Sequence, residues 1–352
     1  MSRWLEPVLE LHLDSEWGSP YWLQRQRELG IDLRREVRTV DDLALLGPFD
    51  LELLRRHPLE HFVPRAMLQG GRQMLLGETG GTSGPPCSVV FLEAEFEAAF
   101  VHPFFHATGW RRESEEGRWL WLGPGGPHLI GRAARRIARE STGCDCFSID
   151  FDPRWYRTLA PGTLMRRRYL GHLLEQARRI LHQQPSVRFL FATPVVLLEL
   201  ASGLEEQVRE RIGFIYLGGM PVEPQPLQAL GEYFPNARLL SGYGNSLFGV
   251  CHEAAPHRPD GEPPRYFPPD DGRMLLQLVS LDPALDDAER LILPVAEGEC
   301  GQVVMHRLDC SLFLPNVMER DQGVRVRAGG REGVEAPQPL QVMGIEIEQG
   351  IY

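Results

Sequence analysis

The chain of 352 residues contains no lysine: all 37 residues in its lysine-plus-arginine total are arginine. A Schiff-base mechanism, a Walker-type phosphate loop and a lysine general base are therefore excluded. Long apolar runs are also missing, since the longest (189–201) contains Pro194 and Glu199 and is too short to span a bilayer. Acidic side chains occur too early in the chain for a signal peptide. These absences predict a cytoplasmic protein that does not enter a membrane.

Cysteine and positive charge are both sparse. Six cysteines spread over a chain of this length do not form a disulfide scaffold. Basic side chains number 37 and acidic side chains 48, which gives a formal net charge of −11. This balance argues against nucleic acid and against an anionic membrane surface as partners. The length predicts about two domains, or one large domain with subdomains.

Hydrophobic periodicity divides the chain into a helical opening, an α/β part and a strand-rich part, expected over 1–65, 66–253 and 254–328. In the middle part, short apolar runs alternate with amphipathic segments, a pattern typical of βα units and a largely parallel sheet. The expected helices there are 130–139, 164–183, 195–200, 205–211 and 226–233, and the expected strands are 146–151, 189–192, 214–217 and 238–240. Later strands are expected at 273–280, 290–293 and 301–307, after an exposed proline-rich loop at 254–272.

The strongest local signal is the run GETGGTSGPP at 77–86. Glycine lets the backbone approach a ligand closely, and successive backbone N–H groups in such a loop form a nest for an anion. The run is not a Walker loop, because position 85 is proline where that motif requires lysine. A flexible surface loop would have the same composition. As a phosphate loop, it would contribute Thr79, Thr82 and Ser83 to catalysis and Gly80, Gly81 and Gly84 to ATP binding.

Two further glycine-containing segments follow expected strands. YLGGMPVEP at 216–224 places Gly218 and Gly219 at the carboxyl end of a strand, where open parallel sheets bind ligands. LLSGYGNSLFG at 239–249 places Tyr243 between two glycines, where its ring could stack on a planar base. Each segment alone is more typical of an ordinary turn than of a ligand site. Their order in the chain favours a common nucleotide site.

In this order the segments resemble the adenylate-forming superfamily of acyl and aryl ligases, nearest its phenylacetate–CoA ligase branch. The loop at 77–86 is similar to the family's phosphate loop, and the pair 218–219 is similar to the glycines beside the adenine. Tyr243-Gly244-Asn245-Ser246 matches the start of the family motif YGxTE. The resemblance therefore assigns ATP or AMP binding to these residues.

Later segments extend the resemblance to residues 19–347. EGECGQVVMHR at 297–307 is similar to the strand motif GExGELVVT. PNVMERD at 315–321 occupies the place of PLIRYRTGD, which implies that Asp321 holds the ribose hydroxyls. Within the superfamily, YGNS, GPHLIG and the segment around PNVMERD are most similar to short, stand-alone adenylating enzymes of phenazine-antibiotic biosynthesis.

The resemblance implies a mixed α/β fold: the large domain of adenylate-forming enzymes over 1–328, with parallel sheets flanked by helices and a smaller strand-rich subdomain. Residues 329–352 would be a hinge remnant, with the mobile C-terminal domain and its catalytic lysine absent. The implied activity is an acid–AMP ligase that converts a carboxylic acid, expected to be aromatic, and ATP to an acyl-AMP and pyrophosphate in specialised-metabolite biosynthesis. Transfer to CoA is not expected, because the mobile domain normally builds the thiolation site.

Two departures concern charge at the phosphates. Magnesium is expected with ATP, but the family's glutamate after YGxT is Leu247 here, and Glu253 is a candidate substitute. The usual phosphate-loop lysine is Pro85, so arginine, magnesium or helix N-termini must supply positive charge. No other metal site is expected. Cys144 and Cys146 are expected to be buried hydrophobes, and three residues match only half of a zinc site known in relatives: Cys251, His252 and His257.

The acid-binding pocket is predicted around GPGGPHLIG at 123–131, where His128 could hold the substrate carboxylate when protonated. Aromatic walls suit a flat acid, although packing in the core is an equally open interpretation of these rings. The aromatic and histidine side chains in this part of the sequence are His102, Phe104, Phe105, His106, Trp110, Trp121 and His128.

Two other functions stay open. An acyl-protein synthetase would pass the acyl group to its own Cys300 or Cys310. A degenerate protein would bind a nucleotide or acyl-adenylate without catalysis, consistent with the missing lysine and with Leu247. The expected partners are a carboxylic acid and ATP, followed by an acyl acceptor, a partner enzyme or a carrier protein. A homodimer is also left open.

Overall fold

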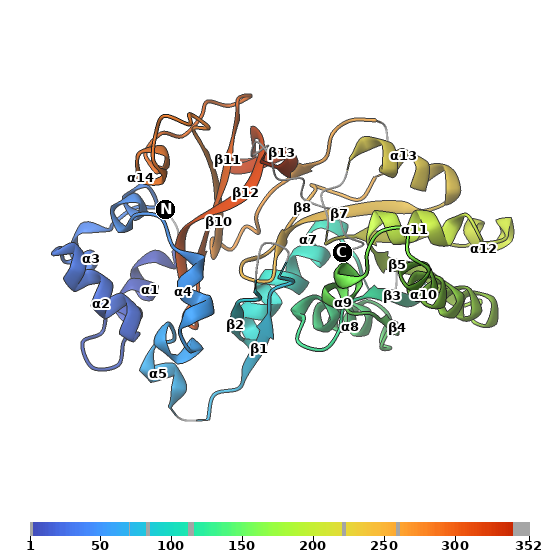
Figure 1. Cartoon of the computed structure of the whole chain (residues 1–352), viewed down its shortest axis with the longest axis horizontal. Coiled ribbons are helices and arrows are strands. Elements are labelled where there is room, and N and C mark those ends of the chain that lie inside the picture. Colours follow the sequence, from blue (N-terminus) through green and yellow to red (C-terminus); the bar gives the residue numbers. More distant parts are fainter. Residues whose placement is uncertain are drawn as a thin grey trace. The chain divides into compact units, whose positions relative to one another are not determined.

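The computed structural model describes residues 3–69, 71–81, 85–111, 116–219, 223–257 and 261–340. The chain forms two compact units (Figure 1). Unit 1 takes residues 1–99, 245–250 and 267–343, and unit 2 takes residues 100–244 and 251–266. The chain passes from unit 2 to unit 1 between Gly244 and Asn245, within the segment that resembles a nucleotide-binding motif.

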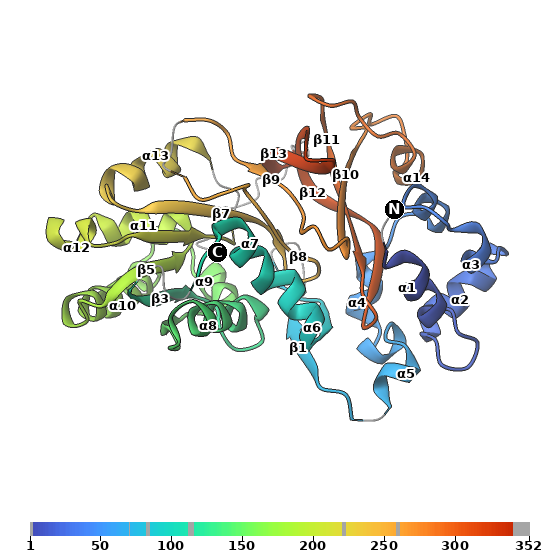
Figure 2. The same cartoon turned by 180° about the vertical axis from the view of Figure 1, so that it is seen from behind.

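Unit 1 opens with short helices, as the sequence predicts. Asp32 and Asp50 begin two of them by accepting hydrogen bonds from the backbone of Arg34 and Glu52. Trp22 is buried and donates from its indole N–H to the carbonyl of Phe313 at 3.2 Å, which joins α2 (Pro20–Leu29) to the sheet of the same unit. Figure 2 shows the opening helices beside strands β10 (Met274–Val279) and β12 (Phe313–Ala328) of that sheet. The elements are α1 (Leu5–His12), α2 (Pro20–Leu29), α3 (Leu33–Glu36), η1 (Asp41–Leu46), α4 (Leu51–Arg56), η2 (Leu59–His61) and α5 (Arg65–Leu68).

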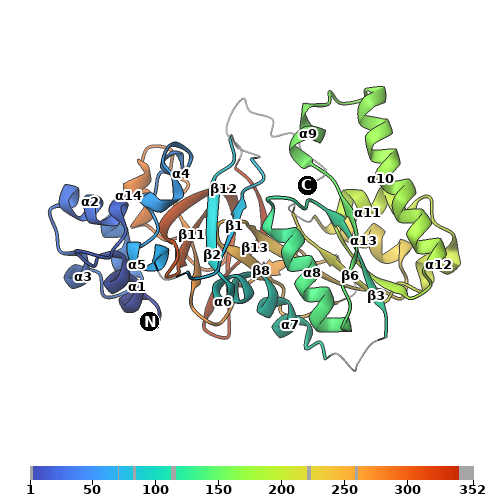
Figure 3. The same ribbon diagram turned by 90° about the horizontal axis from the view of Figure 1, so that it is seen from below.

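The glycine-rich run at 77–86 connects two antiparallel strands, β1 (Met74–Glu78) and β2 (Ser88–Leu92), which lie side by side in Figure 3. Leu76 pairs with Val90 and Glu78 with Ser88. Helix α6 (Glu93–Phe96) follows β2 directly. The run therefore begins within β1 and leads to β2, and the two strands form a hairpin.

An antiparallel sheet completes unit 1, with neighbouring strands in the order β10 (Met274–Val279), β11 (Cys300–Leu308), β12 (Phe313–Ala328) and β13 (Arg331–Pro339). The strand expected at 290–293 is wrong. Helix α14 (Asp287–Leu291) takes the first half of this segment, and Asp286 and Glu289 form a capping box at its start. Ile292 and Leu293, which suggested a strand, are exposed.

Unit 2 is built on a sheet with the strand order β4-β3-β5-β6-β7-β8, in which β4 to β7 are parallel. The strands of this sheet are β3 (Arg118–Gly123), β4 (Phe147–Asp150), β5 (Val187–Ala192), β6 (Phe214–Leu217), β7 (Arg238–Asn245) and β8 (Gly249–His252). The short β9 (Arg265–Tyr266) follows later in the chain and is not part of this sheet. The helices of unit 2 are η3 (Glu97–Val101, begun in unit 1), α7 (His102–Thr108), α8 (Leu129–Thr142), α9 (Pro153–Thr158), α10 (Leu164–Gln183), α11 (Pro194–Ala201), α12 (Glu206–Glu210) and α13 (Pro224–Tyr233). The predicted βα alternation and parallel sheet are confirmed.

The two faces of this sheet differ in chemistry because successive side chains alternate. One face is aliphatic: Leu120, Leu190 and Ile215 pack with α10, α11 and α13 in one core. The other face is aromatic: the ring centroids of Phe191 and Tyr216 lie 4.1 Å apart, and those of Trp121 and Phe191 lie 4.4 Å apart. The aromatic residues are therefore packed core.

Two local predictions are wrong. Tyr266 and Phe267, within the loop expected to be exposed at 254–272, are buried. Cys144 is exposed and Cys146 half-buried, so the pair is not the expected set of core hydrophobes. In the described ranges, no helix has the length and apolarity needed to cross a membrane.

Candidate functional site

The base of the glycine-rich loop at 77–86 is closed by Thr79. Its backbone N–H donates to the carbonyl of Cys87 at 3.0 Å, and its hydroxyl accepts from the Cys87 N–H at 2.9 Å. Gly80 and Gly81 follow and are part of the described chain, whereas Thr82, Ser83 and Gly84 lie outside the described residues. The structure thus places Thr79 where it fixes the mouth of the loop.

An arginine that the sequence analysis did not single out holds the other arm of this loop. Arg55, in α4, donates from Nε to the carbonyl of Pro85 at 2.7 Å, and it forms an ion pair with Glu52 on the same helix. Arg55 therefore places a guanidinium, paired with Glu52, beside position 85 of the glycine-rich loop. In the sequence, Arg55 is only a basic residue near the end of a short expected helix, and nothing there indicates that it contacts the loop 30 positions later.

The turn after β7 is organised by Asn245. Its side-chain oxygen accepts from the backbone N–H of Leu247 at 2.9 Å, and its amide nitrogen donates to a carboxylate oxygen of Glu319 at 2.8 Å. Leu247 is buried at 4% exposure, so position 247 contributes to packing. Ser246 is half-buried in the same turn.

Glu319 lies two residues before Asp321 on β12, and both residues are half-buried. Burial and the nearby charge of Asp321 raise the pKa of Glu319 to about 7. Carboxyl groups with shifted pKa values are common in functional sites. Unit 1 therefore brings Asn245 of the predicted set together with Glu319, which lies within the segment that resembles the ribose-binding motif.

In unit 2, the glycine pair directly follows β6. Gly219 has a φ of 84°, a conformation that favours glycine, and a Cβ on Gly218 would lie 3.5 Å from the Phe191 ring. Tyr243 is mostly buried, with its ring centroid 5.8 Å from that of Tyr266. Gly244 follows at the boundary of the unit.

Glu253, the candidate substitute for the missing glutamate, is engaged inside unit 2. One carboxylate oxygen accepts from the backbone N–H of Ser241 at 2.9 Å and from the Ser241 hydroxyl at 2.5 Å. The other lies 2.8 Å from Nε2 of His257. With 8% of its surface exposed, Glu253 does not fit a metal-binding role.

The residues that match half of a zinc site are also held in local contacts. Nε2 of His252 and the hydroxyl of Tyr216 are 2.7 Å apart, and burial lowers the pKa of His252 to about 3. Cys251 is buried, and burial raises the pKa of its thiol. In the part of the chain that the structure describes, no three His, Cys, Asp or Glu side chains are grouped as metal ligands.

His128 precedes the first residue of α8 and is buried at 7% exposure. The glycine-rich turn before it is fixed by Asp150 at the end of β4, whose carboxylate accepts from the Gly125 N–H. A Cβ on Gly125 would lie 2.7 Å from that carboxylate, so a larger residue there would displace the Asp150 side chain. Of the other pocket candidates, Phe104, Trp110 and Trp121 belong to the aromatic core, while His102 and His106 are exposed and Phe105 is half-buried.

The two cysteines proposed as acyl acceptors differ. Cys300 is exposed at the start of β11. Cys310 is half-buried, and burial together with Glu95 raises the pKa of its thiol, which disfavours the nucleophilic thiolate. Of the two, Cys300 is the more accessible.

No protein-family model and no curated protein matches the chain. Among solved structures, an open conformation of 2-hydroxyisobutyryl-CoA ligase in complex with 2-HIB-AMP and CoA is similar over 95% of this chain and 72% of that chain, with a TM-score of 0.65 and 15% identity. The same ligase in its thioesterification state matches 95% of this chain and 65% of that chain, with a TM-score of 0.63 and 16% identity. The chain thus has the mixed α/β fold of adenylate-forming ligases and spans 65% and 72% of the lengths of these two.

Proposed function

We propose that the protein is an acid–AMP ligase, which joins a carboxylic acid to the α-phosphate of ATP and releases pyrophosphate. The observation that carries this proposal is in unit 1: a glycine-rich hairpin loop with a closed base, and an Asn245–Glu319 pair two residues from Asp321 on the same strand. These features occur on a fold whose solved neighbour is a ligase in complex with 2-HIB-AMP and CoA.

In the proposed reaction the protein positions two anions in line and compensates the charge that develops on phosphorus. Backbone N–H groups of the loop at 77–84 bind phosphate, and Asp321 accepts hydrogen bonds from the ribose hydroxyls. Tyr243 and the glycines at 218–219 contact adenine. His128, at the start of α8, holds the carboxylate of the acid.

Magnesium fits this site through Glu319. The Leu247 side chain is buried and has no oxygen to bind a metal ion. Both oxygens of the Glu253 carboxylate are already in contact with Ser241 and His257. Glu319 offers a half-buried carboxylate oriented by Asn245, and oxygen ligands of this kind are the ones Mg²⁺ prefers. When bound, the ion would offset negative charge on the phosphates. Glu319 would hold it, and Arg55 would add the fixed charge that a loop lysine supplies elsewhere.

We extend the proposal to an aromatic acid and to specialised-metabolite biosynthesis. Support comes from the resemblance of 123–131, 243–246 and 315–321 to short adenylating enzymes of phenazine-antibiotic biosynthesis. Phe104, Trp110 and Trp121 do not add to this support, since they pack as core.

ATP–pyrophosphate exchange, screened over aryl and alkyl carboxylic acids, tests the activity. We expect exchange with a subset of aryl acids. Asp321→Ala should lower kcat/KM for ATP by ~10- to 100-fold, since hydrogen bonds to a charged group contribute about 1.5–3 kcal/mol. Asp282→Ala, in the exposed turn after β10, is the control and should leave exchange unchanged.

Calorimetric titration with a non-hydrolysable acyl-sulfamoyl adenosine separates binding from turnover. Binding that Asp321→Ala weakens supports the nucleotide site. Full activity and affinity in Asp321→Ala would refute the ribose assignment. Nucleotide binding without exchange for any acid would instead favour the non-catalytic alternative.

A further inference from the structure

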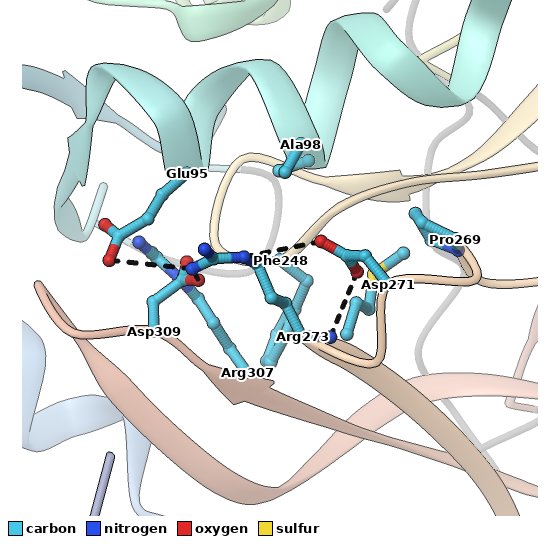
Figure 4. Close-up of a pocket in the computed structure, with 10 residues that line it drawn as sticks. Glu95, Ala98, Phe248, Pro269, Asp271, Arg273, Arg307 and Asp309 are labelled. Atoms are coloured by element: carbon cyan, nitrogen blue, oxygen red, sulfur yellow. Dashed lines mark hydrogen bonds and ion pairs between the residues drawn. The ribbon is translucent and has the colours of Figure 1, made fainter. Parts of the chain in front are cut away.

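A buried arginine connects the two nucleotide-binding elements of unit 1. Arg307 lies in β11 with 1% of its surface exposed, and it lines a small pocket together with Glu95, Arg273 and Asp309 (Figure 4). Its Nε donates to the Asp309 carboxylate at 2.6 Å, and its guanidinium lies 3.5 Å from the centre of the Phe91 ring. Burying such a charge is costly unless it is fully hydrogen-bonded.

The remaining donors of Arg307 reach backbone carbonyls in two other segments. Nη1 donates to the carbonyl of Leu247 at 3.0 Å, in the turn that begins with Asn245. Nη2 donates to the carbonyl of Val90 at 2.6 Å, in the strand that leaves the phosphate loop. One planar group thus joins β2, the turn at 245–248 and its own strand β11, which pairs with the Asp321 strand β12.

Neighbouring charges keep this guanidinium in place. Asp309 also accepts from Arg273 at 3.1 Å, and the Glu95 carboxylate accepts from the Ser311 backbone N–H at 3.1 Å and from its hydroxyl. Ser311 contacts Nη2 of Arg307 at 3.3 Å. The five donors of arginine lie in a fixed fork, whereas lysine has one compact charged group that cannot reach all of these acceptors.

We propose that Arg307 is a positioning residue for nucleotide binding: it holds β2 and the turn at 245–248 in fixed register, so that the phosphate loop and the Asn245–Glu319 pair stay arranged for ATP. The inference rests on the proposed function. In this proposal Arg307 does not touch the reacting atoms, and it acts by holding the groups that bind ATP in their required positions.

The test compares Arg307→Lys and Arg307→Met with Arg325→Met. Arg325 is the matched control, because it lies in the same sheet and contacts a carboxylate, Glu332, and a backbone carbonyl, that of Val295, but neither β2 nor the turn. We expect both Arg307 variants to raise KM for ATP by ~10- to 100-fold, because this is the effect of losing one hydrogen bond to a charged group. Arg325→Met should lower Tm without changing KM.

Hydrogen exchange of the wild type and variants, measured without substrate, gives a readout that does not depend on activity. Exchange should rise at 88–92 and 246–250 in Arg307→Lys and stay unchanged in β5 and β6. If Arg307→Met does not fold, Arg307→Lys carries the test, because a merely electrostatic role would be rescued by lysine. Unchanged exchange at both segments, or a wild-type KM in Arg307→Lys, would overturn the inference. Absence of wild-type ATP–pyrophosphate exchange would refute only the proposed function.

Discussion

Glu253 and Glu319 illustrate how local partners determine what a carboxylate can do. Glu253 follows the motif closely in sequence, but the Ser241 hydroxyl and backbone N–H and the ring of His257 occupy its oxygens. Glu319 is distant in sequence, yet its carboxylate meets Asn245 of the motif. The glutamate that we propose as the magnesium ligand, Glu319, is therefore not the one that lies near the motif in the sequence.

Glu319→Gln should therefore change the magnesium dependence of exchange but not the stability, and Glu253→Gln should change the stability but not the magnesium dependence. We expect Glu319→Gln to raise the magnesium concentration needed for half-maximal exchange by ~10-fold, about 1.4 kcal/mol, with Tm nearly unchanged. Glu253→Gln should reduce the free energy of unfolding by ~1–3 kcal/mol, because it removes the charge that accepts from Ser241, and leave the magnesium dependence unchanged.

Calorimetry with Mn²⁺ in the presence of a non-hydrolysable ATP analogue gives a second readout of the same comparison. Weaker Mn²⁺ binding in Glu319→Gln alone is the expected result. An equal effect in Glu253→Gln, or none in either, would contradict the assignment of the metal to Glu319.

Among the elements, the β1–β2 hairpin has two paired strands and a connection rich in glycine, serine and threonine. Strand pairing from Met74 to Leu92 and the Thr79–Cys87 hydrogen bonds fix the base. Arg55 reaches from α4 to the carbonyl of Pro85 and fixes the outgoing arm. The proposed phosphate binding requires such anchoring, because backbone N–H groups bind an anion only while they converge.

Arg55→Ala should loosen this arm and remove positive charge beside the loop. We expect KM for ATP to rise by ~5- to 20-fold, with a loss of less than about 1 kcal/mol in stability, since the contact is near the surface. Arg56→Ala, the exposed neighbour on α4, is the control. Similar KM values for the two variants would show that Arg55 has no part in ATP binding.

At the scale of the whole molecule, each unit contains buried neutral histidine. Burial lowers the pKa of His12 and His306, in unit 1, to about 4 and that of His252, in unit 2, to about 3. Unfolding returns each to the ordinary value near 6.5, so below that pH the unfolded chain binds more protons. Stability is therefore fully present above pH 6.5 and falls as the pH drops toward 3–4.

Each buried histidine should cost ~2 kcal/mol of unfolding free energy at pH 5 relative to pH 7.5. Urea unfolding at both values measures the change, and unit 1, with two such histidines, should lose about twice as much from this source as unit 2. His252→Gln, compared with the wild type, should flatten the pH dependence of unit 2. An unchanged pH dependence in that variant would contradict the neutral state of His252.

Much of unit 2 was predictable from sequence, because its signals are local. The helix expected at 164–183 and the strand at 214–217 have the observed bounds, and both carry uninterrupted hydrophobic patterns. Strand β3 was missed, since RWLWLG alternates tryptophan with leucine and all but one of its side chains are buried, which hides the periodicity. The predicted boundaries at 253 and 328 stay predictions.

Sequence by itself determined the absence of lysine chemistry, the βα order of the parallel sheet and the places of the glycine-rich turns. These depend on residue type and on neighbours a few positions away. Only the tertiary structure decided that Leu247 packs as core, that the Glu253 carboxylate is hydrogen-bonded, that Arg55 contacts the glycine-rich loop, and that Glu319 and Arg307 contact the turn at 245–248. Such contacts join residues 30 to more than 200 positions apart, and hydrogen bonding across that distance leaves no periodic signal in the chain.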